Sequence, residues 1–414
     1  MVAAGSTLLP ALLALALATA QEPPAAPPAA SSAGALPPAA PLVGKPVERE
    51  QRLALQRAAL DATIARAAAF GHIDEFAAAL RALKAKPIEP VAGDEAANET
   101  DDWRNCARGW LPRMAIDHWL AWHLPAPDKR VPRAIDFDFP NHPYHAIVDL
   151  AKQLHAHDIE FVLVLFPSRL QLYPELVDAA FDPARLGESE AARAAGGAAA
   201  FPGMVGATAQ FLRALNEAGV ETLDLAPPFV AARADGGPEL GEIYLQRNKH
   251  WTPRAAELAA RLVAERLSEQ AWFVPGSSIE GKVFEVMRRK VDIGGAAGGQ
   301  APDTTPEKLA LHQVRQLGAR VNPAEVRGSP IVLLGDSFAR FYSDHGASFG
   351  DQLRRFTGHP IDALTPMGGG ELQCREQLAR RDDRMRGKKV VVWLLQEDNL
   401  LPNAQWKKVA LFDE

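Results

Sequence analysis

The residue best suited to nucleophilic chemistry is Ser337. It follows the apolar run Ile331–Leu334, which predicts a buried strand, and it closes the sequence Gly335-Asp336-Ser337. We expect the chain to turn into a helix there, which places the hydroxyl at the carboxyl edge of a parallel sheet, where open α/β folds bind ligands. The serine N–H then becomes one donor of an oxyanion hole. Gly-Asp-Ser alone is common, so the preceding strand makes Ser337 a candidate.

His250 is the candidate general base for this serine. It lies in Asn248-Lys249-His250-Trp251-Thr252-Pro253. Thr252 and Pro253 are typical of a helix N-cap and first turn, so the histidine stands just ahead of a helix. Histidine is the base that a serine nucleophile most often uses. A lone loop histidine is more often structural, and the hypothesis therefore rests on its pairing with Ser337.

Apolar runs and helical segments alternate around these two residues. Apolar runs separated by helices indicate an α/β fold with a mostly parallel sheet flanked by helices. Residues 276–305 are Gly-rich without clear periodicity, and we interpret them as a long loop or insertion. The expected strands are 161–166, 220–225, 331–334, 361–364 and 390–395, and the expected helices are 145–157, 205–218 and 253–270.

The first hundred residues differ in composition from the rest. Residues 8–18 form an uncharged apolar run before Ala18-Thr19-Ala20, so we expect residues 1–20 to be a signal peptide; a disordered Ala/Pro leader is the alternative. Residues 21–46 read as a Pro/Ala-rich linker, and residues 47–100 as a helical region. Residues 101–414 would be the α/β domain. This organisation predicts a periplasmic or otherwise extracytoplasmic protein.

Charge and cysteine content exclude several classes of function. The 414 residues carry 45 Lys and Arg against 51 Asp and Glu, without a long basic run, so no nucleic-acid partner is expected. Two cysteines exclude a disulfide scaffold and a four-thiolate zinc site. In an oxidising compartment Cys106 and Cys374 would form a disulfide, with two buried free thiols as the alternative. No metal and no other cofactor is expected.

Two blocks, Asn248–Pro253 and the later Gly335–Phe338, match a known pattern together. With Phe166–Arg169, followed by Tyr173–Glu175, and the closing Lys389–Trp393, they make the chain from about residue 103 resemble the alginate O-acetyltransferase group of SGNH hydrolase-like proteins. That group has Asp-x-His-Trp-Thr-Pro ahead of Gly-Asp-Ser-Phe. The histidine-before-serine order is the permuted order of this branch, so the resemblance implies an SGNH hydrolase-like fold.

The resemblance also implies roles for individual residues. Ser337 would accept the acyl group, His250 would be its base, and acetyl would pass through an acyl-serine to a polysaccharide hydroxyl. The implied partners are the polysaccharide substrate, a membrane-bound O-acyltransferase that delivers the acetyl group, and exopolysaccharide assembly proteins. Candidates for the oxyanion hole or for substrate contact are Gly368, Gly369, Gly370, Arg169 and Trp251, with Gln396 and Asn399 as weaker ones.

One departure from the family pattern bears on catalysis. Asn248 stands where the family has an aspartate, and in serine proteases such a change costs about 10⁴ in turnover. Three interpretations stay open: another carboxylate, such as Asp224 or Glu242, reaches His250; the site works as a slower Ser-His dyad; or it has lost catalysis and kept binding. The predicted function is therefore O-acetyl transfer, with an acetylesterase or a polysaccharide-binding component as the alternatives.

Overall fold

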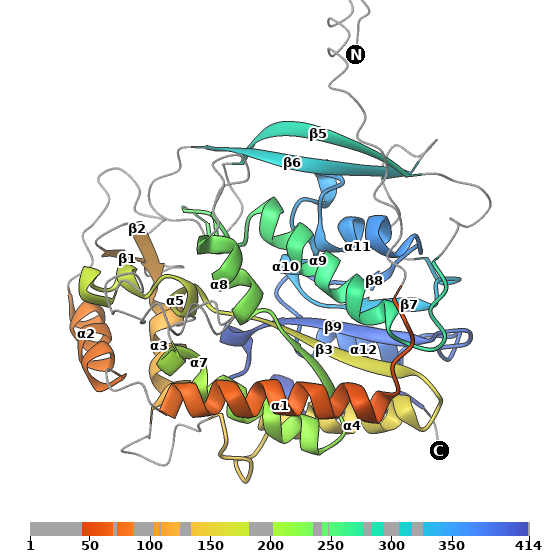
Figure 1. Ribbon diagram of the computed structural model, residues 1–414, viewed down its shortest axis with the longest axis horizontal. Helices are drawn as coiled ribbons and strands as arrows, with labels where there is room; N and C mark the ends of the chain where they lie inside the picture. Colours follow the sequence, from red (N-terminus) through yellow and green to blue (C-terminus); the bar gives the residue numbers. More distant parts are fainter. Residues whose placement is uncertain are drawn as a thin grey trace, which may run out of the picture. The chain divides into compact units, whose positions relative to one another are not determined.

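The computed structural model describes residues 44–68, 73–86, 103–106, 109–124, 134–181, 202–234, 242–246, 248–275, 284–293, 306–316 and 326–412 (Figure 1). The predicted signal peptide, residues 1–20, and nearly all of the predicted linker lie outside these residues. In the part of the chain that is described, no helix has the length and apolar character needed to cross a bilayer.

A five-stranded sheet forms the centre of the fold, in the order β4-β3-β9-β7-β8. Every neighbouring pair in it is parallel. All seven residues of β9 are buried, as expected for a strand covered by helices on both faces. This arrangement confirms the predicted α/β class. The strands are β3 (Glu160–Phe166), β4 (Glu221–Asp224), β7 (Ile331–Leu334), β8 (Asp362–Leu364) and β9 (Val390–Gln396).

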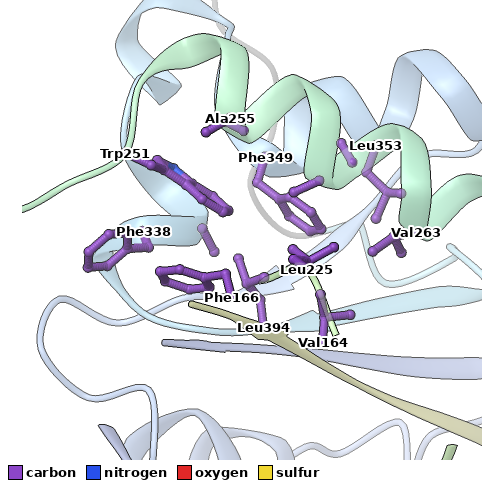
Figure 2. Packing of buried hydrophobic residues seen from close by; sticks show 14 of the residues in the cluster. Val164, Phe166, Leu225, Trp251, Ala255, Val263, Phe338, Phe349, Leu353 and Leu394 are labelled. Atoms are coloured by element: carbon purple, nitrogen blue, oxygen red, sulfur yellow. The ribbon is translucent and has the colours of Figure 1, made fainter. Parts of the chain in front are cut away.

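Helices cover both faces of the sheet (Figure 1). Successive residues of a strand point to opposite faces, so Val162, Val164 and Phe166 enter one core while Phe161, Leu163 and Leu165 enter the other. In the first core, Phe349 and Leu353 of one helix meet Val263 of another above the sheet (Figure 2). The first core holds residues of α8 (Ala226–Ala234), α9 (Pro253–Ser268), α10 (Ser337–Arg340) and α11 (Phe349–Thr357), and the second holds residues of α4 (Pro143–His155), α7 (Pro202–Glu217) and α12 (Gln373–Ala379).

The helical N-terminal region is packed onto the domain rather than separate from it. Helix α1 (Arg49–Ala68) lies along α7. It carries Arg52, whose Nη2 lies 2.9 Å from Oε2 of the fully buried Glu221 on β4. Helix α2 (Ile73–Ala85) packs on α3 (Arg113–His123), where the rings of Phe76 and Trp119 meet edge to face. Smaller described elements are the antiparallel pair β1 (Trp103–Cys106) and β2 (Gly109–Pro112), the short helix α5 (Arg169–Leu172), and short 3-10 turns.

The interpretation of residues 276–305 as a loop is wrong for their middle part. Strand β5 (Phe284–Ile293) pairs with β6 (Glu307–Gln316) as an antiparallel ribbon. In the sequence, the charged run Arg288-Arg289-Lys290 obscures the strand. The buried apolar residues of the described ribbon lie on β6, and they are Leu309, Leu311 and Val314. The ribbon also touches both segments that carry the candidate catalytic residues. Gln246 N–H donates to Glu307, and Val314 N–H donates to the carbonyl of Gly346.

Candidate active site

Ser337 lies on a sharp turn between β7 and α10. Asp336 caps the short helix, with its Oδ1 accepting the N–H of Phe338 at 2.8 Å. Gly335 allows the chain to pass close to its neighbours, because a Cβ there would lie 2.9 Å from the Cβ of Ala339. The serine therefore stands at the carboxyl end of a strand near the middle of the sheet, the edge at which open α/β folds bind ligands.

A tight loop ahead of α9 presents His250. Two backbone hydrogen bonds close it, from Leu245 N–H to the His250 carbonyl at 3.1 Å and from Thr252 N–H to the Ile243 carbonyl at 2.8 Å. Thr252 is then the N-cap of α9. The closed loop brings Nε2 of His250 to 2.9 Å from Oγ of Ser337, which is hydrogen-bonding distance. The two residues singled out in the sequence therefore meet in the structure.

Asn248 determines which nitrogen of His250 carries the proton. Its Oδ1 lies 3.0 Å from the backbone N–H of His250 and 2.7 Å from Nδ1 of the ring. A backbone N–H can only donate, so the atom that faces it must be the amide oxygen. That oxygen can only accept from Nδ1, which must then bear the hydrogen. Nε2 is left with a free lone pair directed at the Ser337 hydroxyl, the tautomer that a general base needs.

No carboxylate contacts His250 among the residues that the structure describes. The two alternatives from the sequence are engaged elsewhere: Asp224 accepts the N–H of Ala226 at 2.9 Å, and Glu242 accepts the hydroxyl of Tyr173 at 3.1 Å. Burial, together with the nearby cations Lys249 and Arg169, lowers the pKa of His250 to about 3. The base is therefore neutral at physiological pH, and no carboxylate stabilises its protonated form.

Arg169 is placed differently from its predicted role in substrate contact. It is buried, and its Nη2 donates to the carbonyls of Leu245 at 2.7 Å and Asn248 at 2.5 Å. Its guanidinium also lies over the ring of Tyr244, 5.2 Å from the centroid. The segment Phe166–Arg169 continues directly from the buried strand β3, and Arg169 therefore lies in the interior beneath the histidine loop. Arg169 thus holds the backbone that carries Asn248 and His250.

Trp251 likewise has no exposed side-chain surface to offer a substrate. Its side chain is fully buried, and its ring lies among Phe166, Phe338 and Phe349 (Figure 2). Trp251 directly follows His250 in the chain. It anchors the loop in the core, while His250 faces Ser337. The structure gives no support to the predicted substrate contact, because the loop turns this side chain into the first core.

Among the three glycines at 368–370, Gly370 packs against the turn Gly335–Ser337 that carries the candidate nucleophile, which we call the nucleophile turn. A Cβ on Gly370 would lie 2.8 Å from the Cβ of Asp336. The carbonyl of Gly369 accepts the N–H of Cys374 at 3.2 Å, and the two ends of a trans peptide point in opposite directions, so the Gly370 N–H is directed away from α12. Gly368 makes the turn possible with a left-handed φ of 67°.

Cys374 is a free thiol in the structure, and a disulfide with Cys106 stays a prediction. The sulfur is fully buried on α12, and it donates to the carbonyl of Gly370 at 2.8 Å. Burial raises the pKa of this thiol well above its ordinary value. The side chain of Cys106 lies outside the described residues. Cys374 therefore supports the glycine turn from the interior.

The two weaker candidates after β9 are part of the supporting hydrogen bonds. Gln396 donates from Nε2 to the hydroxyl of Tyr244 at 3.1 Å. Asn399 donates from Nδ2 to Oδ2 of Asp336 at 3.3 Å. Asn399 therefore helps to orient the aspartate that caps the helix of Ser337, and Gln396 steadies the ring beneath Arg169.

Sequence reasoning missed Phe341, which lies directly against the base. Its ring is parallel to the imidazole of His250, with centroids 4.0 Å apart and an interplanar angle of 2°. Phe338 covers the imidazole less squarely, at 4.7 Å and 43°. The only signal in the sequence was the aromatic content of the segment after Ser337, which does not show what those rings touch.

Within the described residues, no group of three or more His, Cys, Asp or Glu is arranged to hold a metal ion. The geometry is that of a serine hydroxyl hydrogen-bonded to a neutral histidine, oriented by an amide oxygen, at the edge of a parallel sheet. This fold and site define an α/β domain of the SGNH hydrolase-like class. The chain belongs to the family described as SGNH hydrolase-like domain, acetyltransferase AlgX, whose model matches residues 126–397, more than half of the chain.

Solved structures of similar fold include the O-acetyltransferase domain of Pseudomonas putida AlgJ, with a TM-score of 0.50 and 18% identity, covering 74% of this chain and 93% of that one. Pseudomonas aeruginosa AlgX has a TM-score of 0.44 and 21% identity, covering 64% of this chain and 57% of its own. Bacillus cereus PatB1 has a TM-score of 0.41 and 14% identity, covering 74% of this chain and 97% of its own. No curated protein matches the sequence.

Proposed function

We propose that the protein is an O-acetyltransferase that moves an acetyl group onto a hydroxyl of an extracytoplasmic polysaccharide through an acyl-serine intermediate. The observation that carries this proposal is the chain of hydrogen bonds from Ser337 through His250 to Asn248, 2.9 Å and 2.7 Å long, in a domain of an acetyltransferase family. The acetyl donor is an activated acetyl ester or thioester.

In the first half of the reaction, Nε2 of His250 takes the proton of the Ser337 hydroxyl while Oγ attacks the acetyl carbonyl carbon. Negative charge then develops on the carbonyl oxygen, and the N–H groups of Ser337 and Gly370 are the proposed donors that stabilise it. When the bond to the donor's oxygen or sulfur breaks, His250 returns its proton to that leaving atom. Acetyl is left as an ester on Ser337.

The second half repeats these steps with the acceptor. A sugar hydroxyl gives its proton to His250 and attacks the acetyl-serine carbonyl, and the proton then returns to Oγ as Ser337 leaves. If water enters instead of the sugar, the same steps release acetate. An acetylesterase is therefore the outcome to be separated from a transferase by experiment.

The acceptor, the partners and the compartment are inferred from resemblance and from the N-terminus. The likeness of the motif blocks to the alginate O-acetyltransferase group supports a polysaccharide acceptor, delivery of acetyl by a membrane-bound O-acyltransferase, and association with exopolysaccharide assembly proteins. The apolar run at residues 8–18 and the Pro-rich stretch to residue 46 support export to the periplasm.

The proposal is tested first by release of p-nitrophenol from p-nitrophenyl acetate, with the mass of the intact protein followed in parallel. We expect the wild type to release p-nitrophenol and to gain the mass of one acetyl group, and Ser337→Ala to do neither. Addition of an acceptor oligosaccharide should move the acetyl group from the protein to the sugar. Release without transfer to any sugar would establish an esterase. If neither the wild type nor Asn248→Asp releases p-nitrophenol or gains an acetyl group, the proposed enzymatic activity is refuted. A polysaccharide-binding role would then replace it.

A further inference from the structure

The ring of Phe341 is stacked on the imidazole of His250. The centroids are 4.0 Å apart and the planes differ by 2°, so the two rings are parallel and in contact. The face of an aromatic ring carries negative charge, and a cation within about 6 Å of the ring centroid is attracted to it. The stack can therefore stabilise the imidazole of His250 more strongly once the imidazole is protonated.

The chain is held firmly in the conformation that produces this stack. The N–H of Phe341 donates to the carbonyl of Ser337 at 2.7 Å. The next residue, Tyr342, has a left-handed φ of 74°, which is unfavourable for a bulky side chain. Its hydroxyl donates to the carbonyl of Trp251 at 2.8 Å. Strained backbone persists where the surroundings fix it and is concentrated at functional sites. Here the strained residue Tyr342 links the segment after Ser337 to the loop that carries His250, and Phe341 lies between them.

We propose that Phe341 is a positioning residue whose ring face stabilises the imidazolium form of His250 when Ser337 is deprotonated. This inference rests on the proposed function. Asn248 orients the ring through a neutral oxygen, and Lys249 and Arg169 are cations that oppose its protonation. The aromatic face thus supplies part of the stabilisation that a carboxylate at position 248 would give. Because it acts on the charged form, it lowers the barrier without tightening the resting state.

The test uses the full-length mature protein and phenylmethylsulfonyl fluoride, which sulfonylates an activated serine without any sugar acceptor. The rate of single sulfonylation at Ser337 is followed by intact mass. Phe341→Leu keeps an apolar cover of similar size and removes the ring face, and we expect it to react about tenfold more slowly. Phe341→Tyr restores a ring face and should react at close to the wild-type rate. Phe412→Leu is the matched control, since it removes another histidine stack, Phe412 on His157 at 3.7 Å.

A second background separates an electrostatic role from a structural one. In Asn248→Asp the carboxylate stabilises the imidazolium, so the loss on adding Phe341→Leu should shrink to less than about threefold. The pH–rate profile in that background should also move, with the apparent pKa of His250 lower in the double variant than in Asn248→Asp alone.

The outcomes are distinct. Equal sulfonylation rates in wild type and Phe341→Leu, or the same loss in both backgrounds, would overturn the role of Phe341 while leaving the serine chemistry intact. A wild type that never sulfonylates at Ser337 would instead overturn the proposed function, and this inference with it. Thermal unfolding of each variant identifies any that fails to fold, and Phe341→Tyr then decides the test.

Discussion

The side-chain oxygen of Asn248 accepts from His250 twice, from the ring Nδ1 at 2.7 Å and from the backbone N–H at 3.0 Å. The backbone bond prevents the amide from turning its NH₂ toward the ring, which would reverse the tautomer. In serine proteases the exchange of aspartate for asparagine costs about 10⁴ because the wrong tautomer forms. Here the tautomer is kept and only the charge is missing, so we expect the site to be weakened rather than disabled.

Restoring the family aspartate should therefore strengthen the site. We expect Asn248→Asp to raise the rate of Ser337 acylation by about 10- to 100-fold at neutral pH, because a carboxylate stabilises the imidazolium that forms. The burst of p-nitrophenol from p-nitrophenyl acetate measures this rate. Asn403→Asp, on an exposed turn, is the control for the added charge. An unchanged rate would show that charge at position 248 does not limit acylation.

The wild-type rate should not show the titration of an ordinary histidine. The pKa of His250 is lowered to about 3 by burial, aided by Lys249 and Arg169. The ring therefore stays neutral, and able to accept a proton, from neutral pH down to about pH 5. We expect the acylation rate to be flat over that range, while Asn248→Asp loses activity as pH falls because its histidine titrates at a higher pH. A wild-type rate that halves near pH 6.5 would contradict the buried, uncompensated base.

Stability should fall on acidification for a related reason. Burial lowers the pKa of His118 and His155 to about 4 and that of His250 to about 3. The unfolded chain takes up these protons near pH 6.5, whereas the folded chain does not, so the free energy of unfolding decreases as pH falls from about 6.5 toward 4. We expect His155→Gln to flatten this dependence, as seen in urea unfolding at several pH values. A variant as acid-sensitive as the wild type would assign the effect to other groups.

Removing Arg169 should affect catalysis through the histidine loop. Arg169→Met leaves the carbonyls of Leu245 and Asn248 without their donor, so we expect kcat to fall about tenfold or more with KM little changed. The free energy of unfolding should fall by about 2 kcal/mol. Steady-state kinetics and chemical unfolding measure the two effects, with the exposed Arg386→Met as the control. A rise in KM alone would return Arg169 to a role in substrate binding.

Gly370 should tolerate no side chain. The added Cβ of Gly370→Ala would meet the Cβ of Asp336 at 2.8 Å and push the glycine amide away from the nucleophile turn. The loss of one oxyanion donor costs about 10²–10³ in rate, and we expect acylation to fall by about that much. The control is Gly328→Ala, where a Cβ meets nothing within 4 Å. If both variants acylate at the wild-type rate, another amide serves as the second donor.

The sheet could be predicted from the sequence because its strands are continuous apolar runs. Phe161–Phe166 and Val390–Leu395 are buried on both faces and contain few polar residues, so their strands were placed to within a residue or two. Strand β5 was missed because its charged residues mask any alternation, and of its described side chains only Val291 and Ile293 pack, partly buried, against the core. The meeting of Ser337 and His250 was also predictable, because Ser337 follows a buried strand and the blocks that contain the two residues resemble the motifs of one family.

The contacts around that pair could not be predicted in the same way. Arg169 and Trp251 looked available to substrate because residue type alone does not show which way a loop directs a side chain. The stack of Phe341 on His250 joins segments far apart in the sequence, and it depends on a left-handed residue, Tyr342, that no local preference favours. Such contacts are set by packing between elements and not by spacing along the chain.

The last strand of the sheet is also its middle strand. Strand β9 pairs with β3 on one side and β7 on the other, and the sheet order places no contact between β3 and β7 themselves. Synthesis of the chain must therefore reach Gln396 before the two halves of the sheet can join. Until then, β3 and β7 each have one edge without a neighbouring strand, a state prone to aggregation. We expect a chain truncated before Val390 to lack a protease-resistant sheet. A translocation channel that carries unfolded chains would then encounter no completed sheet that has to be unfolded first.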